Sequence, residues 1–434
     1  MKATVASRRS SSQKKASSAT APRQKSSLCC RACGSNGLRS ILDLGRMPLA
    51  NAFLTERQLR SPELVYPLEL VFCPECALVQ ITETVPPEIL FRHYLYFSSF
   101  SDEMLQHARD IATRTLRSRR LDGKSLVVEI ASNDGYLLQF YRLAGIPVLG
   151  IEPAENIARA AEQERDIRTI SRFFSLGLAQ SLTKQGQRAD VIHANNVLAH
   201  VSDLSGFLLG IAMLLKPGGV AIIEVPYVKE LIERVEFDTI YHEHLSYFAL
   251  TPLHRLMESH GLTIADVERL EIHGGSLRIF VEHLSSESHA SPVVRQILSD
   301  EADRGLASFR FYQEFERRVL GLKDDLLKLL RALKTQGSRI AAYGASAKGS
   351  TILNYFGIDR SILDFVVDRS TVKQGLYTPG AHLPICKPEK LLEAMPDHVL
   401  LLTWNFAEEI LEQQAEYRRR GGRFIIPIPV PQVI

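Results

Sequence analysis

The chain has 434 residues, 45% of them hydrophobic, which is too long for one hydrophobic core and predicts two or three domains. No stretch approaches the roughly 20 uninterrupted apolar residues that a membrane span needs, and no apolar signal run follows the basic N-terminus. We therefore expect a cytoplasmic protein with no membrane partner. The formal charge is +3, but seven basic residues precede Cys29, so the remainder carries −4, which argues against a nucleic-acid-binding surface.

The first 28 residues differ in composition from the rest of the chain. They contain no Asp or Glu and are mostly Ser, Ala, Lys and Arg, so they cannot bury enough apolar surface to become ordered. We expect a disordered, basic, Ser-rich tail over residues 1–28 that could touch an anionic partner. An organelle-targeting peptide is the alternative.

Two C-x-x-C pairs follow the tail, Cys30 with Cys33 and Cys73 with Cys76. Two such pairs suit a tetrahedral zinc ion, because each turn brings two thiolates to one side of the metal. Four thiolates leave no open position for water, so we expect a structural zinc in a zinc-ribbon domain over 29–85. Two redox dithiols are the alternative, but they would need a thioredoxin-like βαβ context that this segment lacks.

Strand and helix patterns alternate over residues 86–285. An amphipathic helix is expected from about Ser101, and short apolar strands follow it. We expect these strands at 126–130, 148–152, 191–196 and 215–226. Alternating β and α elements predict a doubly wound parallel sheet that binds ligands beyond the carboxyl ends of its strands.

The ends of the first two strands indicate the ligand. Glu129 ends the first, and Glu152 ends the second, where a carboxylate can accept both hydroxyls of a ribose. A dinucleotide site would need G-x-G-x-x-G, but the loop here contains Asn133, one glycine at Gly135, and an aspartate that would repel phosphate. A phosphate-free nucleoside fits better, and S-adenosylmethionine is the common one. The Lys-Pro-Gly-Gly turn at 216–219 is also typical of class I methyltransferases, whereas a cofactor-free α/β domain is the alternative.

The segment 241–248, Tyr-His-Glu-His-Leu-Ser-Tyr-Phe, concentrates acid/base groups. Histidine titrates near neutrality and is the usual choice for removing a proton. In an extended chain His242 and His244 would share a face, whereas in a helix Tyr241 and His244 would be close at i, i+3, and the sequence leaves both open. A hydrogen-bonded polar core is the alternative. A His-Glu-His metal site is a less favoured interpretation, because the spacing of these residues is not that of an H-E-x-x-H helix.

Two asparagines end the strand expected beside the cofactor. We expect Asn195 and Asn196 to contact the cofactor, and His200 follows them closely enough to complete an acid/base set. A capping or packing role for His200 is the alternative.

Residues 286–434 predict a second Rossmann-like α/β domain. Charged and apolar residues mix at helical spacing up to residue 336, which indicates helices that bridge the two domains. A strand then enters a turn that resembles a phosphate cradle, with Ser346, Lys348 and Gly349 as substrate contacts. Lys348 precedes the second glycine, so the turn is not a Walker loop. A tight strand-to-helix turn with an exposed lysine is the alternative. Further strands are expected at 364–368 and 399–403, with a closing strand at 424–427.

Seven short motifs are spread between Cys30 and Pro429. They lie at 30–34, 96–99, 129–135, 195–201, 241–248, 273–278 and 343–350. Together they resemble one family, the three-domain C-methyltransferases that act on nucleotide-linked keto-deoxysugars. The resemblance implies a zinc-binding domain, a Rossmann-like methyltransferase domain and a C-terminal Rossmann-like domain that helps to seat the nucleotide-sugar.

The resemblance also implies roles for single residues. It places His200, Tyr241, Glu243 and His244 in the sugar pocket, with His244 as the base, and Tyr96 among the substrate contacts. We therefore expect an S-adenosylmethionine-dependent C-methyltransferase that acts on a nucleotide-linked, dTDP-type 4-keto-6-deoxysugar at C3 through an enolate.

The sequence leaves two other functions open. Methylation of a hydroxyl or amine on a similar sugar is the first. A zinc-ribbon nucleic-acid-binding regulator with a degenerate methyltransferase core is the second, and the intact set of Glu129, Glu152 and His244 argues against it.

Overall fold

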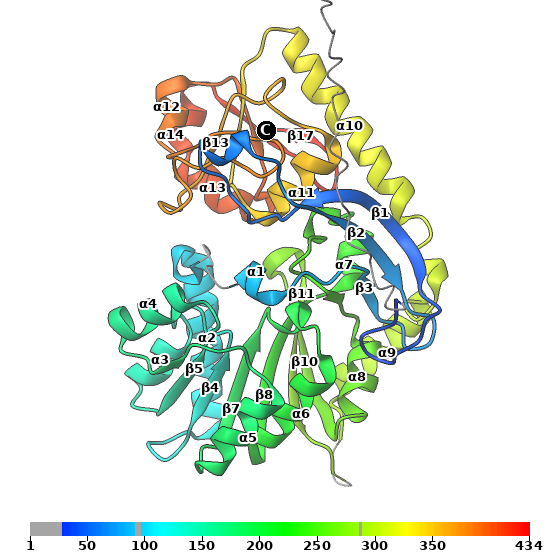
Figure 1. Cartoon of the computed structure of the whole chain (residues 1–434), viewed down its shortest axis with the longest axis vertical. Helices are drawn as coiled ribbons and strands as arrows, with labels where there is room; N and C mark the ends of the chain where they lie inside the picture. The colour runs from blue at the N-terminus through cyan, green and yellow to red at the C-terminus, as the bar shows by residue number, and fades with distance from the viewer. Residues whose placement is uncertain (1–27, 92–96, 286–288) are drawn as a thin grey trace, which may run out of the picture.

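The computed structural model describes residues 28–91, 97–285 and 289–434, which form three β-sheets (Figure 1). The tail expected over residues 1–28 lies outside the described residues except for Leu28, so its predicted disorder stays a prediction. Among the described helices, none combines the length and apolar composition of a membrane span.

The first sheet is antiparallel, with the order β1-β2-β3-β9. Its strands are β1 (Arg39–Pro48), β2 (Val65–Phe72), β3 (Val79–Ile81) and β9 (Ser246–Tyr247). In β9, Tyr247 pairs with Val79 and Ser246 pairs with Gln80. The sheet of the zinc-ribbon region is therefore completed by the segment that carries the predicted catalytic residues, far along the chain.

The second sheet has the order β10-β11-β8-β7-β4-β5-β6. Its strands are β4 (Val127–Ile130), β5 (Val148–Ile151), β6 (Thr169–Ile170), β7 (Ala189–Asn195), β8 (Leu215–Pro226), β10 (Leu262–Leu270) and β11 (Ser276–His283). The five strands from β6 to β8 are parallel, and β11 runs antiparallel to β8 and to β10. The predicted doubly wound parallel sheet is confirmed, and its chain order reverses between β4 and β7, where such sheets bind ligands.

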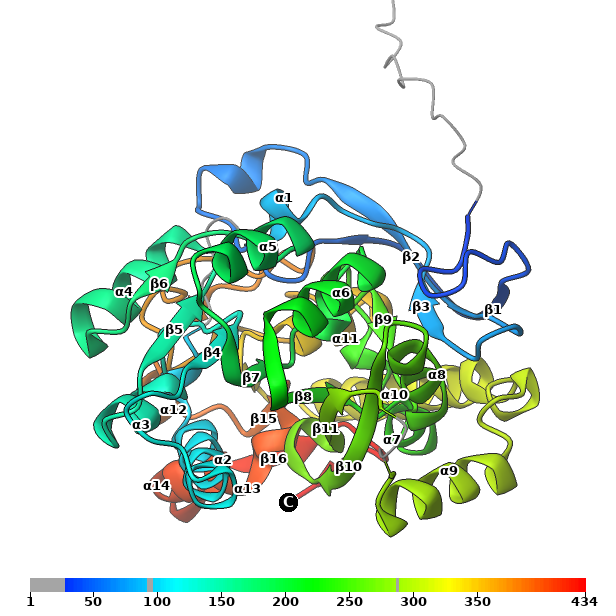
Figure 2. The ribbon, with the colours of Figure 1, turned by 90° about the horizontal axis from the view of Figure 1, so that it is seen from below.

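Helices cover both faces of this sheet (Figure 2). They are α2 (Asp102–Arg119), α3 (Leu138–Leu143), α4 (Glu155–Arg165), α5 (Leu176–Lys184), α6 (Leu204–Leu214) and α8 (Leu250–Glu258), whereas α7 (Val228–Glu233) lies beyond the carboxyl end of β8. Apolar residues of α2 and α3 pack on one face, and those of α5 and α6 pack on the other. All four residues of β4 are buried, which explains why this strand is a continuous apolar run broken only by Glu129.

The third sheet has the order β14-β13-β12-β15-β16-β17. Its strands are β12 (Ile340–Tyr343), β13 (Val366–Val367), β14 (Ile385–Cys386), β15 (His398–Leu401), β16 (Arg423–Ile426) and β17 (Gln432–Val433). The predicted Rossmann-like sheet is confirmed, but the strand expected to close it at 424–427 is not the edge. β17 pairs antiparallel with β16 and lies outside it, because the chain turns back after Pro429.

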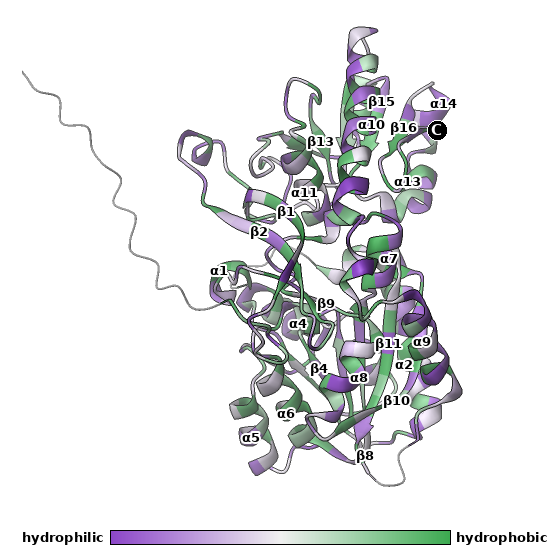
Figure 3. Ribbon diagram, turned by 90° about the vertical axis from the view of Figure 1, so that its right-hand side faces the viewer, coloured by the Kyte–Doolittle hydropathy of each residue, from purple (hydrophilic) through white to green (hydrophobic). Residues whose placement is uncertain are grey.

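Two long helices join the second and third sheets, as the helical spacing predicts. These are α9 (Pro292–Arg304) and α10 (Phe315–Thr335), and α10 runs along one side of the molecule (Figure 1). Hydrophobic and hydrophilic residues alternate along α10 in the hydropathy colouring (Figure 3), and Val319, Leu326 and Leu330 are buried. The shorter helices of the remaining parts are α1 (Pro87–Phe91), α11 (Ala347–Phe356), α12 (Lys390–Ala394), α13 (Ala407–Gln413) and α14 (Ala415–Arg419).

Candidate functional site

The four predicted zinc ligands lie together. The cluster consists of Cys30, Cys33, Cys73 and Cys76, with all four sulfur atoms within 4.8 Å of one another. The two knuckles are built alike, because Gly34 N–H donates to the Cys30 carbonyl and Ala77 N–H donates to the Cys73 carbonyl, both at 2.9 Å. Gly34 and Ala77 also share a positive φ, 75° and 64°. Four thiolates at this spacing fit a tetrahedral zinc ion with no open position.

Two acids lie at the carboxyl ends of β4 and β5, as predicted. Glu152 accepts the backbone N–H groups of Asn133 at 3.0 Å and Ala154 at 2.9 Å, and burial raises the pKa of its carboxyl to about 7. Burial, together with the charges of Asp134 and Glu152, raises the pKa of Glu129 well above its usual range. Hydroxyl or ammonium donors of a bound ligand would stabilise the charged form of both carboxylates.

Several buried polar atoms at this edge have no partner within the described part of the chain. They are Oε2 of Glu129, both side-chain polar atoms of Asn195, and Oδ1 of Asn196. Asn133, Gly135 and Asn196 have positive φ, which bends the loops after β4 and β7 sharply at the sheet edge. Because buried polar groups are normally hydrogen-bonded, the edge fits a polar ligand. The ribose and amino-acid groups of S-adenosylmethionine offer such donors and acceptors.

The Tyr241 motif forms a tight turn, which decides between the two conformations that the sequence leaves open. The N–H of His244 donates to the Tyr241 carbonyl at 2.9 Å, and their ring centroids are 4.1 Å apart. His244 Nδ1 lies 2.9 Å from the Thr239 carbonyl, and because a carbonyl only accepts, Nδ1 carries the proton. Nε2 is therefore the basic nitrogen, and the Tyr241 hydroxyl donates to it at 2.9 Å.

His200 and Glu243 lie beside this pair. His200 ends η3 (Leu198–His200), and its ring centroid is 4.9 Å from that of His244. Its Nδ1 donates to the Glu243 carbonyl at 2.7 Å, and burial lowers its pKa to about 4, so it is neutral at pH 7. The Glu243 carboxylate accepts Asn51 Nδ2 at 2.7 Å. The structure thus brings together His200, Tyr241, Glu243 and His244, whereas Tyr96 lies outside the described residues.

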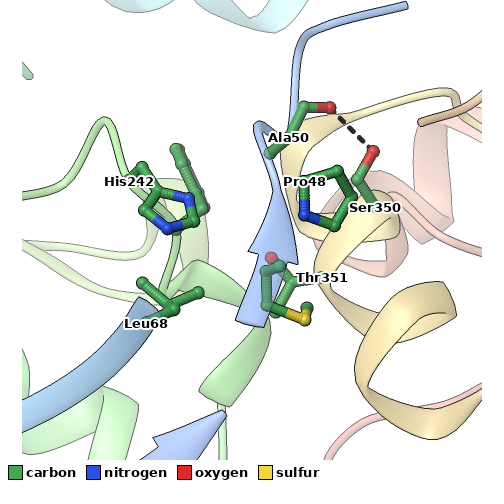
Figure 4. Close-up of a pocket in the computed structure, with 8 residues that line it drawn as sticks. Pro48, Ala50, Leu68, His242, Ser350 and Thr351 are labelled. Atoms are coloured by element: carbon green, nitrogen blue, oxygen red, sulfur yellow. Dashed lines mark hydrogen bonds between the residues drawn. The ribbon is translucent and has the colours of Figure 1, made fainter. Parts of the chain in front are cut away.

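His242 turns away from this group. Its Nε2 donates to the Pro67 carbonyl at 3.1 Å, outside the turn. It borders a gap too small for a water molecule, where all three parts of the chain meet (Figure 4). On the opposite side of that gap, Ser350 Oγ donates to the Ala50 carbonyl at 2.8 Å. This junction is a packed contact and has no room for a substrate.

The predicted phosphate residues lie at the start of α11. Ser346 is its N-cap and accepts the Gly349 N–H at 3.0 Å. A Cβ at Gly349 would lie 2.8 Å from Cβ of Leu402, so this glycine allows close packing of α11 on the chain after β15. Lys348 is half-buried, with its Nζ 4.9 Å from the Trp404 ring centroid. It is therefore not the exposed lysine of the alternative interpretation.

Two buried acids lie near Lys348. Burial raises the pKa of Glu236 to about 8 and also raises that of Asp238, while the charge of Lys348 opposes both shifts. Trp404 Nε1 donates to Asp238 Oδ2 at 2.7 Å. A phosphate beside Lys348 would be repelled by these two carboxylates if they were charged. It would bind best with both acids protonated, the form that their raised pKa values favour.

The motif at 273–278 has a structural role that the sequence did not reveal. Arg278 is buried, and it donates from Nε to Glu224 at 2.6 Å and from Nη1 to Glu268 at 2.8 Å. Although burial opposes it, the hydrogen bond from His107 and the charge of Arg278 lower the pKa of Glu224 to about 2. These two ion pairs join β8, β10 and β11.

Sequence reasoning also missed two residues that hold the site. Asn51 binds Glu243, and Trp404 binds Asp238 of η4 (Phe237–Thr239). Asn51 carries no local signal, because its partner lies 192 residues away. Trp404 could have been suspected, since it is the one tryptophan of the chain and follows a predicted strand at a sheet edge.

Three family models match consecutive parts of the chain. A zinc binding domain matches residues 30–91, a methyltransferase domain matches 102–267, and the C-methyltransferase C-terminal domain matches 271–429. Together with the cysteine cluster and the sheet order, these matches define an S-adenosylmethionine-dependent methyltransferase that contains a zinc-binding domain.

The C-methyltransferase NovU of Streptomyces niveus is 36% identical over 405 residues, which cover 93% of this chain and 96% of that protein. The chain belongs to this family of zinc-binding C-methyltransferases. A ubiquinone biosynthesis O-methyltransferase of Methylobacterium sp. is 25% identical over 194 residues, 40% of this chain and 76% of that protein. Magnesium protoporphyrin IX methyltransferase of Synechocystis, solved with bound SAM, covers 42% of this chain and 79% of its own at 17% identity and a TM-score of 0.32.

Proposed function

We propose that the chain methylates C3 of a nucleotide-linked, dTDP-type 4-keto-6-deoxysugar, with His244 as the base. The observation that carries the proposal is the Tyr241–His244 pair, in which Nδ1 is fixed as a donor and Nε2 is the basic nitrogen. Methylation of carbon needs such a base, because a C–H bond next to a ketone must first lose its proton. The sugar and its nucleotide are inferred from the resemblance of the seven motifs.

In the proposed reaction, His244 Nε2 takes the proton from the carbon beside the ketone. The C–H electron pair becomes the enolate double bond, and the ketone oxygen becomes negative. The Thr239 carbonyl, which accepts Nδ1–H, stabilises the imidazolium, and the Tyr241 hydroxyl can then donate to the oxyanion. Glu129, Glu152 and Asn195 would hold S-adenosylmethionine, which would supply an electrophilic methyl group to the enolate carbon and leave as the neutral thioether.

His200 suits a different task. Its low pKa keeps it neutral, so it does not repel the positive charge that forms on His244. With Nδ1 bound to the Glu243 carbonyl, its Nε2 is an acceptor that can bind a sugar hydroxyl or amine. The Glu243 carboxylate, held by Asn51, can orient a further polar group of the sugar.

The remaining assignments follow from the two sheet edges. We assign the cofactor to Glu129, Asn133, Gly135, Glu152, Asn195 and Asn196, and the substrate to Tyr96, Ser346, Lys348 and Gly349. Unpartnered buried atoms support the first set. The second is supported by the positive end of α11 and by Lys348, which suit a diphosphate. We divide the chain into a zinc-binding domain at 29–85, a methyltransferase domain at 86–285 and a C-terminal domain at 286–434.

The test is methylation of nucleotide-linked keto-sugars, with nuclear magnetic resonance of the product. We expect a new methyl group on carbon and loss of the C3 proton, and in heavy water that proton should exchange with deuterium. A product that keeps every carbon-bound proton and carries its methyl group on oxygen or nitrogen would contradict the proposal and favour the alternative reaction.

Replacement of His244 tests the base. His244→Asn should lower turnover by about 100- to 10,000-fold, the usual effect of losing a general base, with zinc content and cofactor affinity unchanged. His242→Asn is the matched control, because this histidine of the same turn contacts the Pro67 carbonyl instead. Normal turnover by His244→Asn would contradict the assignment of His244 as the base, but it would not contradict methylation of carbon.

A further inference from the structure

Arg31 connects the zinc site to the catalytic turn. It lies inside the first knuckle, between Cys30 and Cys33, and its side chain is half-buried. Its guanidinium reaches the catalytic segment, where Nη1 donates to the Leu245 carbonyl at 3.3 Å. That carbonyl belongs to the residue directly after His244, so one side chain spans the distance between the metal ligands and the proposed base.

The guanidinium is held by several other acceptors. Nη1 also donates to the Ile81 carbonyl at 2.6 Å, while Nη2 donates to the Glu83 carbonyl at 3.0 Å and the Thr84 hydroxyl at 2.7 Å. The backbone N–H of Arg31 donates to Gln80 Oε1 at 3.0 Å. A planar guanidinium bound at this many points has a defined position, and no lysine could reproduce its geometry.

Leu245 is fixed from two sides. Its N–H donates to the Ala199 carbonyl at 2.7 Å, and its carbonyl accepts Ile81 N–H at 3.1 Å in addition to Arg31. Ala199 directly precedes His200. The peptide groups on either side of Leu245 therefore set the chain that carries His244 against both His200 and the zinc-binding sheet.

We propose that Arg31 is a positioning residue, through which the zinc-organised knuckle holds the catalytic turn 241–245 in place. The role given to His244 rests on the proposed function, but the mechanical link does not. Zinc fixes the backbone of the knuckle, and the knuckle sets the position of the Arg31 guanidinium. The guanidinium in turn restrains the Leu245 carbonyl, next to His244. A structural metal thus acts on turnover without touching substrate or cofactor.

Hydrogen exchange tests the link in the full-length, zinc-loaded protein without substrate. Arg31→Ala should retain zinc and speed amide exchange in peptides covering 241–248, while exchange in β12 and β15 stays unchanged. Arg46→Ala is the matched control, since Arg46 also donates to a backbone carbonyl of the zinc-binding sheet, that of Val65, but makes no contact with the turn. Should Arg31→Ala lose its zinc, chelation of the wild type must speed exchange at 241–248. Unchanged exchange there in either experiment overturns the proposal.

Kinetics test the consequence for catalysis. Arg31→Ala should lower kcat about 10- to 100-fold, the scale expected from misplacing a catalytic group, with KM for S-adenosylmethionine within about twofold of wild type. Arg31→Lys should recover part of the loss through one donor, and Arg46→Ala should behave as wild type. A kcat equal to wild type in zinc-loaded Arg31→Ala overturns the positioning role. If the wild type does not methylate carbon, the proposed function fails, and the exchange result still decides the link.

Discussion

Glu301 offers the strongest stability prediction, because α8 depends on it for its first turn. The N-cap of α8 is Ala249, which has no side chain to cap the helix. Glu301 of α9 takes that place and accepts the N–H groups of Leu250 at 2.7 Å and Thr251 at 2.8 Å. It also accepts the hydroxyls of Tyr227 at 2.8 Å and Thr251 at 2.6 Å, and its side chain is fully buried.

The expected cost of Glu301→Ala follows from these four bonds. Hydrogen bonds to a charged group contribute roughly 1.5–3 kcal/mol each, so a simple sum would reach about 6–12 kcal/mol. Water entering the vacated space would satisfy part of the donors, and removal of one partner from a buried charged contact costs about 3–5 kcal/mol in other proteins. We therefore expect Glu301→Ala to lower the free energy of unfolding by about 3–5 kcal/mol. Glu301→Gln should cost less, roughly 1–3 kcal/mol, since one oxygen remains while the new amide faces a backbone donor.

Urea unfolding followed by circular dichroism gives these values, provided that the transition of this part of the chain is resolved. Asp300→Ala is the matched control, because Asp300 is the preceding residue of α9 and is exposed, so its loss should change stability by about 0.5 kcal/mol or less. The reasoning would be refuted if Glu301→Ala and Asp300→Ala destabilised the protein equally. α8 begins two residues after Phe248, so amide exchange at 241–248 should also quicken in Glu301→Ala.

Two further predictions concern the metal and the cofactor. Cys73→Ser should release zinc, measured by elemental analysis, and destabilise the N-terminal sheet, because a structural metal contributes folding free energy directly; purified wild-type protein without zinc would contradict this. Glu152→Ala should weaken S-adenosylmethionine binding by roughly 1.5–3 kcal/mol per charged hydrogen bond lost, seen by titration calorimetry. The pKa of Glu152 is raised to about 7 by burial, and its charged form is the better acceptor, so wild-type affinity should fall as pH drops below about 7. Glu152→Ala should flatten that pH profile, and an unchanged profile would place the titrating group elsewhere.

The parts of the site that the sequence predicts are those encoded over short spans. Each C-x-x-C knuckle is a single turn, so its spacing alone indicates the metal and its closed coordination. Glu129 and Glu152 end buried strands, and parallel strands bring their carboxyl ends to one edge, so their proximity follows from the order of elements. The same logic predicts the second Rossmann-like sheet, although not its antiparallel edge strand, which is only two residues long.

The parts that the sequence does not predict depend on contacts between distant segments. Whether the Tyr241 motif is extended or turned is decided by the Thr239 carbonyl, by Asn51 and by Arg31, the last two lying 192 and 214 residues from their partners. Neither periodicity nor spacing reports such contacts. Lys348 is a similar case, because its environment depends on Trp404 and on the acids at η4, and the sequence around Lys348 suggests only an exposed or phosphate-binding lysine.

These long-range contacts converge on one short segment. β9 completes the zinc-binding sheet, the Ile240 carbonyl accepts Thr351 Oγ1 of α11 at 3.2 Å, and Leu245 N–H donates to the loop after β7. Residues 240–247 are thus bonded to the zinc-binding sheet, to α11 and to η3, so the orientation of the turn depends on all three parts of the chain, whereas the tautomer of His244 is set locally by the Thr239 carbonyl. If this turn carries the base, as proposed, its shared support explains why a zinc ion with no open coordination position belongs in a methyltransferase. The metal stabilises the small sheet with which the turn pairs through β9. Loss of zinc should therefore lower the stability of the N-terminal region and also disturb the geometry of the turn.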